Sequence, residues 1–542
     1  MKKIYMALFL CGVTAASFAQ TFHWVKTGGN GTFIDYGLGV TVDNNHHVIA
    51  TGMHFDNGTF GSTTITGFGY QDAFVAKYDS TGTLMWVKGI GGADQDWGYA
   101  VATDASDNIF VTGSYQMGTL HFTATDSLAI SSSSAKNVFI AKYDANGNFL
   151  WARNGSASYS SGTSIATDAS GNAIISGFYN GSANFSSNAL TGGATNLFFV
   201  KYSPTGTVLW AKSGTSSSLC YTNALKCDAA GNIYATGKIS QNITFGSSTF
   251  THQGGDDMYT AKFNSNGDVQ WLQLEGKTLL ASTTSNNFDC GNGIDVDNSG
   301  NVYVAGSLLD TFISASFYQS AAIVKYNNAG TKQWLYKYGN NNGIDVFNGL
   351  SLDAAGNPYA FGTYSGALTI GSSVLPAATD HDVFVAKFNT AGNCLGTIAV
   401  GTGNGDDDGN GIFIDKNGGS IYLTGTLRNG LTFGTVNAVA DNAGNIFVAK
   451  MSGNAITGIE EGMTAIPFVV YPNPSSAYVN LQFEAEGEYL MQVYNTMGQL
   501  LFSAETNESF TQIDMSSFSP GNYFLMVSDH SGNVFTRKIV KE

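Results

Sequence analysis

The sequence predicts an all-β protein with a seven-bladed β-propeller followed by a small C-terminal Ig-like β-sandwich. Two short phrases recur seven times each, about 62 residues apart, and a fixed long period indicates a repeat architecture. Glycine is abundant at 67 residues, whereas charged residues make up only 12% of the chain and aromatic residues 13%. This balance favours strands and turns over helices, whose surfaces need Lys, Glu and Arg.

The N-terminus predicts export. Residues 1–19 read MKKIYMALFLCGVTAASFA, two lysines followed by a short apolar run and small residues, which is typical of a secretory signal peptide cleaved after Ala19. That run is too short for an ordinary membrane anchor, and we expect no transmembrane segment in the mature chain. Without Lys2 and Lys3, 22 basic residues face 40 acidic ones, a net charge of 22 − 40 = −18. Nucleic acid is therefore excluded as a partner, because phosphate binding needs a basic surface.

The repeat itself predicts the blades. Its first phrase is an Asp-x-x-Gly turn, which fits a type I turn followed by a glycine at positive φ, and its second is the phrase F-x-A-K-[YF]. Each repeat contains four short strand-like runs, for example 99–103, 109–114, 138–143 and 149–153. Four strands in each of seven units indicate a seven-bladed propeller. The leading aspartates are Asp43, Asp104, Asp168, Asp228, Asp297, Asp353 and Asp415, and the lysines are Lys77, Lys142, Lys201, Lys262, Lys325, Lys387 and Lys450.

The fourth strand of a repeat carries a tryptophan, and the seventh repeat lacks this strand. The sixth repeat keeps the strand with Gly396 in the tryptophan slot. The mature chain begins QTFHWVKTGG, with Trp24 ahead of the first complete repeat. We therefore expect the N-terminal strand to complete the last blade, which would remove an open sheet edge.

The phrases D-x-x-G-N-x-[YF]-x-x-G and F-x-A-K-[YF] resemble the SBBP-type bacterial β-propeller repeat over residues 20–458. The resemblance implies the fold and no particular activity. Four cysteines remain after signal removal, at Cys220, Cys227, Cys290 and Cys394. They lack metal-site spacing, and their disulfide pairing is left open, with Cys220 and Cys290 as one candidate pair.

The composition changes near residue 459. Residues 20–458 contain one glutamate, Glu275, and the rest of the chain contains eight. Residues 459–466 read as a linker, and residues 467–542 alternate as the strands of a small sandwich. This segment resembles the C-terminal sorting domain of the type IX secretion system of Bacteroidota. The matching residues are Tyr471, Pro472, Asn473 and Pro474, the turn ending at Gly498, the pair Gly521 and Tyr523, and the terminal run from Lys538.

The second resemblance implies a route and a partner. The signal peptide would deliver the chain to the periplasm, and the secretion machinery would move it across the outer membrane. The protein would then be extracellular or attached to the cell surface. Whether the sorting domain is cleaved, and whether the protein is anchored or released, stays open. The alternative is an ordinary accessory sandwich that binds a ligand.

One face of the predicted propeller carries candidate binding residues. In five repeats an aspartate lies eight residues before the turn aspartate, and the other two repeats have Ser160 and Cys220 there. These side chains precede the innermost strand, so they could ring the channel mouth and bind a cation or glycan hydroxyls. The alternative, which their repetition favours, is that each caps a tight turn by accepting backbone N–H bonds. The five are Asp35, Asp96, Asp289, Asp345 and Asp407.

Calcium is the one candidate cofactor. The run Asp406, Asp407 and Asp408 resembles a calcium loop in composition but lacks the EF-hand order. The motifs HExxH, GxSxG, GxxxxGK[ST] and CxxC are all missing from the sequence, so no catalytic residue is assigned. The repeated lysines are expected to pair with turn carboxylates.

We therefore expect an exported, non-catalytic propeller that binds a glycan or a surface protein. Loop aromatics that could stack on sugars, or equally belong to the core, are Tyr70, Trp97, Tyr115, Tyr159 and Tyr179. The alternative is an extracellular hydrolase or lyase that uses aspartates at the channel mouth. The third hypothesis is a structural or adhesive surface-layer protein.

Overall fold

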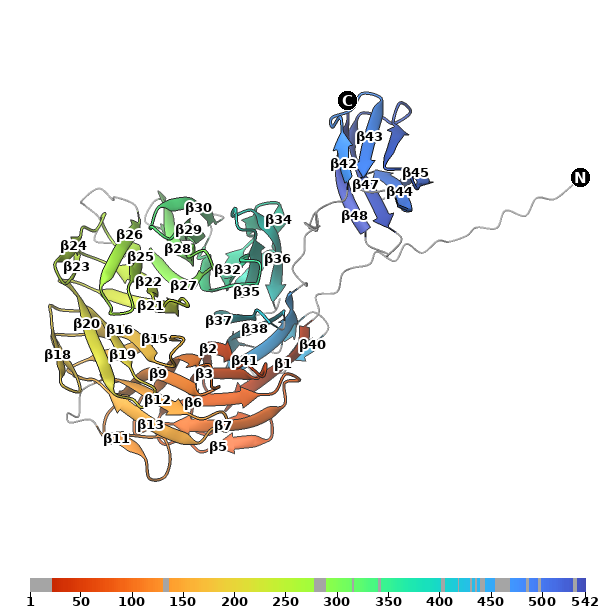
Figure 1. Ribbon diagram of the computed structural model, residues 1–542. Helices are drawn as coiled ribbons and strands as arrows, with labels where there is room; N and C mark the ends of the chain where they lie inside the picture. The colour runs from red at the N-terminus through yellow and green to blue at the C-terminus, as the bar shows by residue number, and fades with distance from the viewer. Residues whose placement is uncertain are drawn as a thin grey trace, which may run out of the picture. The chain divides into compact units, whose positions relative to one another are not determined.

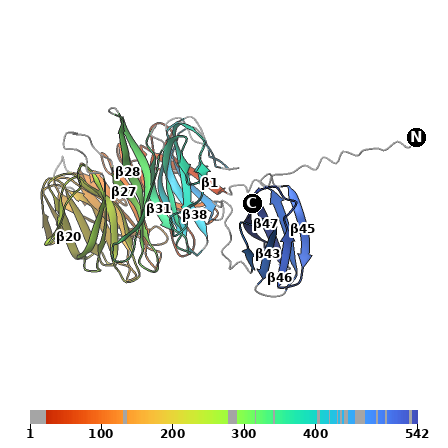
Figure 2. The ribbon, with the colours of Figure 1, turned by 90° about the horizontal axis from the view of Figure 1, so that it is seen from above.

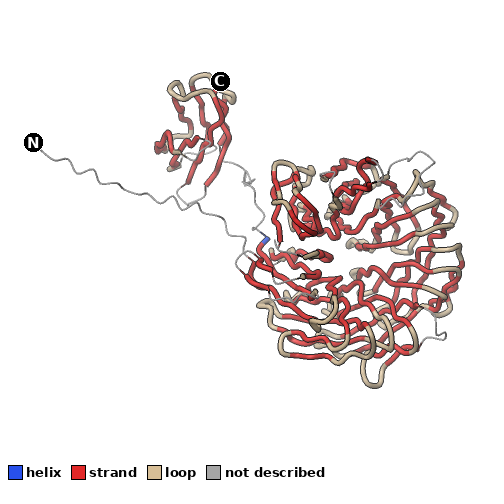
Figure 3. The backbone as a smooth tube through the Cα atoms, turned by 180° about the vertical axis from the view of Figure 1, so that it is seen from behind, coloured by secondary structure: helices blue, strands red, loops and turns tan. Residues whose placement is uncertain are grey.

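The structure is a computed structural model, and it describes residues 22–129, 136–276, 289–313, 316–339, 343–400, 405–417, 419–428, 431–433, 436–438, 444–453, 468–483, 487–495, 499–529 and 534–542. The chain divides into two compact units, Met1–Ile456 and Thr457–Glu542. Within the described ranges both units are built from strands, with no α-helix and one short 3₁₀ turn at Gly453 (Figure 3). The prediction of an all-β protein is confirmed. The expected signal peptide and the linker 459–466 lie outside the described residues.

Seven antiparallel sheets of four or six strands form most of the described part of the first unit, and smaller two- and three-stranded sheets accompany them. Their strands, in order of pairing, are β2 (Tyr36–Val42), β3 (Val48–Phe55), β6 (Gln71–Tyr78) and β7 (Leu84–Ile90); β8 (Trp97–Thr103), β9 (Ile109–Gln116), β12 (Lys136–Tyr143) and β13 (Phe149–Asn154); β15 (Ser160–Thr167), β16 (Ala173–Tyr179), β19 (Asn196–Tyr202) and β20 (Val208–Ser216); β21 (Cys220–Cys227), β22 (Ile233–Ile239), β25 (Asp257–Phe263) and β26 (Val269–Glu275); β27 (Cys290–Val296), β28 (Val302–Ile313), β29 (Ser316–Tyr326) and β30 (Lys332–Tyr338); β31 (Val346–Leu352), β32 (Pro358–Gly366), β35 (Ala378–Phe388) and β36 (Cys394–Val400); and β37 (Asp408–Asp415), β38 (Ser420–Leu427), β41 (Asn445–Ser452) and β1 (Phe22–Gly29).

The sheets of this unit are arranged around a common centre (Figure 1). The first strand of each sheet contacts the first strand of the next, in the order β2, β8, β15, β21, β27, β31 and β37, and β37 in turn contacts β2. Figure 2 shows neighbouring sheets side by side, with strands running between the two faces of the unit. The arrangement is that of a β-propeller-like fold, in which each sheet buries its faces against its two neighbours.

Short hairpins, which the sequence did not predict, lie between second and third strands. Two of them extend a neighbouring sheet, because β4 pairs with β1 and β23 pairs with β20. The hairpins are β4 (Gly58–Phe60) with β5 (Thr63–Ile65), β10 (Thr119–His121) with β11 (Ser127–Ala129), β17 (Ser182–Phe185) with β18 (Asn188–Thr191), β23 (Ile243–Phe245) with β24 (Ser248–Phe250), β33 (Thr369–Ile370) with β34 (Ser373–Val374), and β39 (Leu431–Phe433) with β40 (Val436–Ala438), while β14 (Ser156–Ala157) pairs with β17.

The repeated turn has the geometry that its residues predict. At Asp168 the carboxylate Oδ1 accepts hydrogen bonds from the amides of Ser170 (2.9 Å) and Asn172 (3.0 Å). The amide of Gly171 donates to the Asp168 carbonyl, and Gly171 has a φ of 73°. Glycine adopts this φ without strain, whereas His46 and Asp107 take the same turn position in the first two repeats with φ values of 62° and 61°.

The N-terminal strand lies in the last sheet. Strand β1 pairs antiparallel with β41 and brings Trp24 opposite Lys450, as Trp86 lies opposite Lys77 in the first sheet. Trp24 Nε1 and Lys450 Nζ both donate to the Ser80 carbonyl, at 3.2 and 3.0 Å. This shared acceptor ties the last sheet to a turn of the first. In the sixth sheet Gly396 lies opposite the lysine.

The repeated lysines are structural, as expected. Lys77 lies 2.8 Å from Asp43, and Lys201 lies 2.8 Å from Asp168, in buried ion pairs. Others lie over a ring of the second strand, such as Lys325 at 4.8 Å from the Tyr303 centroid, which adds a cation–π attraction. The four cysteines of the described chain are free thiols, so the candidate pair Cys220 and Cys290 is not bridged.

The second unit contains two sheets around one core. One sheet consists of β42 (Phe468–Tyr471), β43 (Tyr478–Phe483) and β46 (Phe510–Asp514), and the other of β45 (Leu500–Thr506), β44 (Tyr489–Asn495), β47 (Gly521–Asp529) and β48 (Val534–Lys541). Side chains from both sheets form a single buried cluster that includes Leu481, Val493 and Leu525. Two sheets that share one core make a β-sandwich.

Candidate ligand-binding face

The five repeated aspartates are buried, each at most 1% exposed. Each carboxylate accepts a hydrogen bond from a backbone amide at or near the end of a second strand. This is the bonding expected of a structural cap, and a ligand-binding role of the five aspartates stays a prediction. The bonds join Asp35 to Phe55 (2.8 Å), Asp96 to Gln116 (3.2 Å), Asp289 to Leu309 (2.5 Å), Asp345 to Ser365 (3.2 Å) and Asp407 to Arg428 (2.7 Å).

Asp96 has a second carboxyl group beside it. Asp96 Oδ2 accepts from the Gly92 amide at 2.5 Å, and a Cβ at the preceding Gly91 would lie 1.8 Å from Asp72 Oδ1. Burial raises the pKa of Asp96 to about 8, with a smaller contribution from the charge of Asp72. Burial also raises the pKa of Asp72 to about 6. Because Gly91 and Gly92 have no side chains, the carboxyl groups of Asp72 and Asp96 can both lie close to the backbone of this loop.

Sequence reasoning missed the Asp72 position. It is the residue two places before the aromatic residue in the phrase DAFVAK, so a signal was present within the repeat. The same place is taken by Asp257 and Asp382, whose pKa values burial raises to about 6. These groups form a second set of buried carboxyls that titrate within reach of neutral pH.

The acidic run does not converge on one point. Asp406 is half-exposed and pairs with His381 Nδ1 (3.0 Å) and Arg428 (3.7 Å). Asp407 is buried, and burial raises its pKa to about 7. Burial also raises the pKa of Asp408, which begins β37. No group of three or more His, Cys, Asp or Glu within the described ranges could hold a metal ion. Calcium binding here stays a prediction.

Aromatic side chains gather on the face where first strands begin. We define the aromatic arc as Tyr36, Trp97, Tyr99, Tyr159, Phe178 and Tyr221, which come from four consecutive sheets or the connections leading into them. Tyr36 and Trp97 are stacked with centroids 5.9 Å apart, and Trp97 lies 5.6 Å from Tyr99. Tyr159 lies 5.9 Å from Phe178, which contacts Tyr221 edge-on at 4.9 Å.

A lysine joins the two halves of the aromatic arc. Lys136 Nζ lies 5.9 Å from the Tyr99 centroid and 5.8 Å from the Tyr159 centroid. Burial lowers the pKa of Lys136. At the end of the arc, Lys238 Nζ lies 5.7 Å from the Tyr221 centroid and 2.8 Å from Asp256. One ammonium group thus lies between the two halves of the aromatic arc, and a second lies at its end.

The loop aromatics named from the sequence divide into two groups. Trp97 is half-buried and Tyr159 is 38% exposed, both in the aromatic arc. Tyr70 is also exposed, outside the arc. Tyr115 and Tyr179 are fully buried in hydrophobic clusters, so for these two residues the core role is the correct one.

The aromatic arc borders the central cavity of the first unit. This cavity has a volume of about 480 Å³, and Tyr99 lines it together with four asparagines. Each asparagine donates to a backbone carbonyl of the next first strand, which forms a belt of hydrogen bonds between sheets. The bonds run from Asn223 to Gly291 (3.2 Å), Asn292 to Phe347 (3.0 Å), Asn348 to Gly409 (2.9 Å) and Asn410 to Gly37 (2.9 Å).

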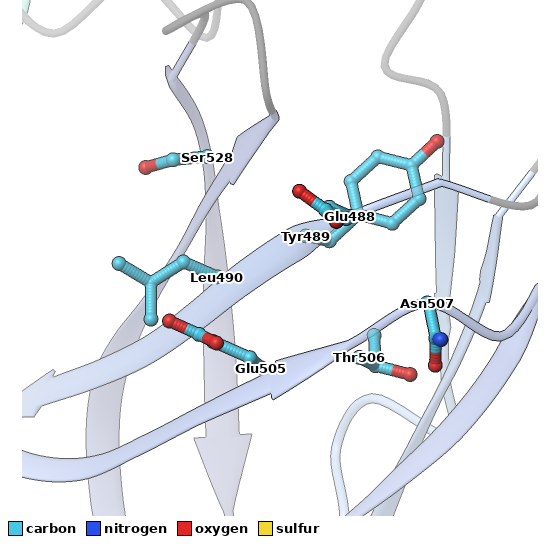
Figure 4. A pocket seen from close by; sticks show the side chains of 7 residues that line it. All are labelled: Glu488, Tyr489, Leu490, Glu505, Thr506, Asn507 and Ser528. Atoms are coloured by element: carbon cyan, nitrogen blue, oxygen red, sulfur yellow. The ribbon is translucent and has the colours of Figure 1, made fainter.

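In the second unit the predicted sorting residues contact the terminal strand. Asn473 Nδ2 donates to the Lys538 carbonyl (2.7 Å), and the Val540 amide donates to Asn473 Oδ1 (2.8 Å). Tyr523 is buried in the core, and Gly498 lies outside the described residues. A shallow hollow of about 520 Å³ lies over β44 and β45, lined by Glu488, Glu505 and neighbours (Figure 4).

Residues 469–542 match the model of the secretion system C-terminal sorting domain. The predicted sorting domain is thereby confirmed, and the match indicates secretion by the type IX system to the cell surface or extracellular space. Among the described residues, no helix has the length and apolar character needed to cross a membrane.

Two relatives match parts of the chain at low identity. An uncharacterized WD repeat-containing protein of Acanthamoeba polyphaga mimivirus is 24% identical over 75% of this chain and 36% of its own length. An ulvan lyase of Nonlabens ulvanivorans is 27% identical over 25% of this chain and 26% of its own length. The chain thus spans about a third or less of these relatives.

Two solved structures align with parts of the chain at low TM-scores. The polysaccharide lyase Uly1 aligns over 77% of this chain and 90% of its own, with 11% identity and a TM-score of 0.38. The Cps50 (Swd1) β-propeller domain of Myceliophteria thermophila aligns over 65% of this chain and 96% of its own, with 7% identity and a TM-score of 0.30.

Proposed function

We propose that the first unit is a secreted seven-bladed β-propeller that binds a glycan along the aromatic arc without altering it. Each of the seven sheets is one blade of an SBBP-like repeat in residues 20–458, and β1 completes the last blade after signal cleavage. The contacts between successive first strands and the pairing of β1 with β41 support this architecture. The linker 459–466 and the sorting domain 467–542 complete the chain.

The aromatic arc is the observation that carries the proposal. Sugar rings present C–H faces that pack on aromatic side chains, and rings already stacked on each other lose little freedom on binding. Centroid separations of 4.9 to 5.9 Å place a row of such surfaces along several saccharide units. Rigid strands hold this row, which keeps the binding surface preorganised.

Titration calorimetry of the mature chain with a panel of bacterial and algal polysaccharides tests the proposal. Trp97→Ala removes the ring between Tyr36 and Tyr99 and should weaken binding at least tenfold, equivalent to about 1.4 kcal/mol. Tyr478→Ala removes an exposed aromatic side chain from the second unit and should leave binding unchanged. Binding that survives Trp97→Ala, or a protein that binds none of the polysaccharides, contradicts the proposal.

A polysaccharide lyase is the second candidate. The match to an ulvan lyase over a quarter of the chain suggests this activity. The structural observation in its favour is that Lys136 lies beside Tyr159. Elimination at a uronate needs a cation near the carboxylate and a group that moves a proton. The binding proposal predicts no unsaturated uronate in ultraviolet absorbance, whereas product lost in Tyr159→Phe would establish the lyase.

The remaining alternatives have less support from the geometry. A hydrolase using the five repeated aspartates would need reactive carboxylates, and these side chains are buried with backbone amide partners. A structural or adhesive role predicts self-association of the mature chain without any glycan, which sedimentation would detect.

A further inference from the structure

The ammonium group of Lys136 lies in an unusual setting. It is half-buried at the start of β12, between the rings of Tyr99 and Tyr159. Within the part of the chain that the structure describes, no carboxylate lies within 4.0 Å of it. Lys238 at the end of the same aromatic arc has Asp256 as its partner, and the buried Lys77 and Lys201 have turn aspartates.

A half-buried ammonium without a carboxylate is costly, because it has lost part of its hydration. Burial lowers the pKa of Lys136 for this reason. Cation–π attraction to the two tyrosine rings offsets part of this desolvation cost, by about 0.5–2 kcal/mol. The formal net charge of the chain is −16, so carboxylates are abundant elsewhere on the protein. An anionic ligand would supply the negatively charged partner that the Lys136 ammonium group lacks among the described residues.

We propose that Lys136 binds the anionic group of an acidic saccharide, either the carboxylate of a uronic acid or a sulfate ester. The inference rests on the proposed glycan binding. One saccharide unit stacks on Tyr36 and Trp97, and the acidic unit beside it directs its charge to Lys136. The chain continues over Phe178 and Tyr221 toward Lys238.

Two of the carboxyl groups beside the aromatic arc oppose an approaching anion only weakly. Asp96 directly precedes Trp97, and burial raises the pKa of Asp96 to about 8, so its carboxyl group is largely uncharged at neutral pH. Asp256 is neutralised by Lys238 at 2.8 Å. Because the protein as a whole is acidic, attraction of an acidic glycan must come from this local group and not from the net charge.

Calorimetric titration of the mature chain with three probes tests the inference: oligogalacturonate as a uronate, dextran sulfate as a sulfate ester, and neutral dextran. We expect one of the acidic probes to bind at least tenfold more tightly than dextran, and added salt to weaken it. The acidic probe that binds identifies the source of the charge. Lys136→Gln should reduce its affinity 10- to 100-fold, about 1.4–2.8 kcal/mol, while Lys136→Arg should retain most of it.

Lys212→Gln is the matched control, since Lys212 is an exposed lysine paired with Asp268 on an outer strand. Unchanged melting temperatures separate lost binding from lost folding. If Trp97→Ala abolishes binding but Lys136→Gln does not, glycan binding stands and the role of Lys136 is overturned. If the wild-type chain binds none of the three probes or the wider panel, both proposals fail together.

Discussion

The pair Asp72 and Asp96 makes the stability of the first unit depend on pH, and one substitution should remove the contribution of Asp96. The pKa of Asp96 is raised to about 8 in the folded protein from an ordinary value of 3.8. A raised pKa means that the folded state holds the proton more tightly than the unfolded state does. The stabilisation is complete below pH 3.8 and is lost as the pH rises toward 8.

The magnitude follows from the size of the shift. Each pH unit between the two pKa values costs about 1.4 kcal/mol, so Asp96 alone should lower the free energy of unfolding by roughly 3 kcal/mol between about pH 5 and about pH 7. Asp96→Asn cannot ionise and removes this slope. Its amide nitrogen will face one of the two backbone amides that now donate to the carboxylate, a constant cost of about 1–3 kcal/mol.

Urea unfolding followed by tryptophan fluorescence measures this difference. All seven tryptophans lie in the first unit, so the signal reports that unit alone. We expect Asp96→Asn to be less stable than wild type near pH 5 and to recover about 3 kcal/mol relative to it near pH 7. Ser160→Ala, at the same repeat position but without a titratable group, should run parallel to wild type. Parallel profiles for Asp96→Asn would refute the buried, raised-pKa description of this pair.

Two further predictions concern the ends of the chain. Trp24→Ala should destabilise the first unit by about 3–5 kcal/mol, because Trp24 is 7% exposed and donates to Ser80 across two sheets; the same urea assay measures it, and a loss below 1 kcal/mol would contradict the role of β1. Deletion of residues 469–542 should leave the first unit folded inside the producing cell and absent from the surface and medium. Cell fractionation followed by antibody detection measures where the truncated chain is found. Delivery of the truncated chain to the surface would refute the sorting function.

The architecture could be predicted from the sequence because the same two motifs occur in every repeat. The Asp-x-x-Gly turn and the lysine phrase set local geometry, as Asp168 and Lys201 show, and local geometry is what a sequence encodes most directly. The position of Trp24 could be predicted because the seventh repeat lacks the fourth strand, which carries a tryptophan in most other repeats. The sorting residues could be assigned because several motifs occurred in order at the terminus.

The candidate binding face was harder to predict because it depends on the packing between repeats. Asp96 and Asp345 have acidic side chains in loops, yet both are fully buried, and each accepts a hydrogen bond from an amide near the end of a second strand. The aromatic arc combines residues from different offsets in different repeats, such as Tyr99 on a first strand and Phe178 on a second strand. The asparagine belt occurs in only part of the ring, so no sevenfold pattern marked it.

The central claim is that a glycan lies along the aromatic arc with its acidic group at Lys136. A crystal structure of the mature chain with an acidic oligosaccharide tests it most directly. We predict a sugar ring against Tyr36 and Trp97, and a carboxylate or sulfate oxygen within hydrogen-bond distance of Lys136 Nζ. A saccharide bound elsewhere, for example in the hollow over β44 and β45, with the aromatic arc left empty, would contradict the account.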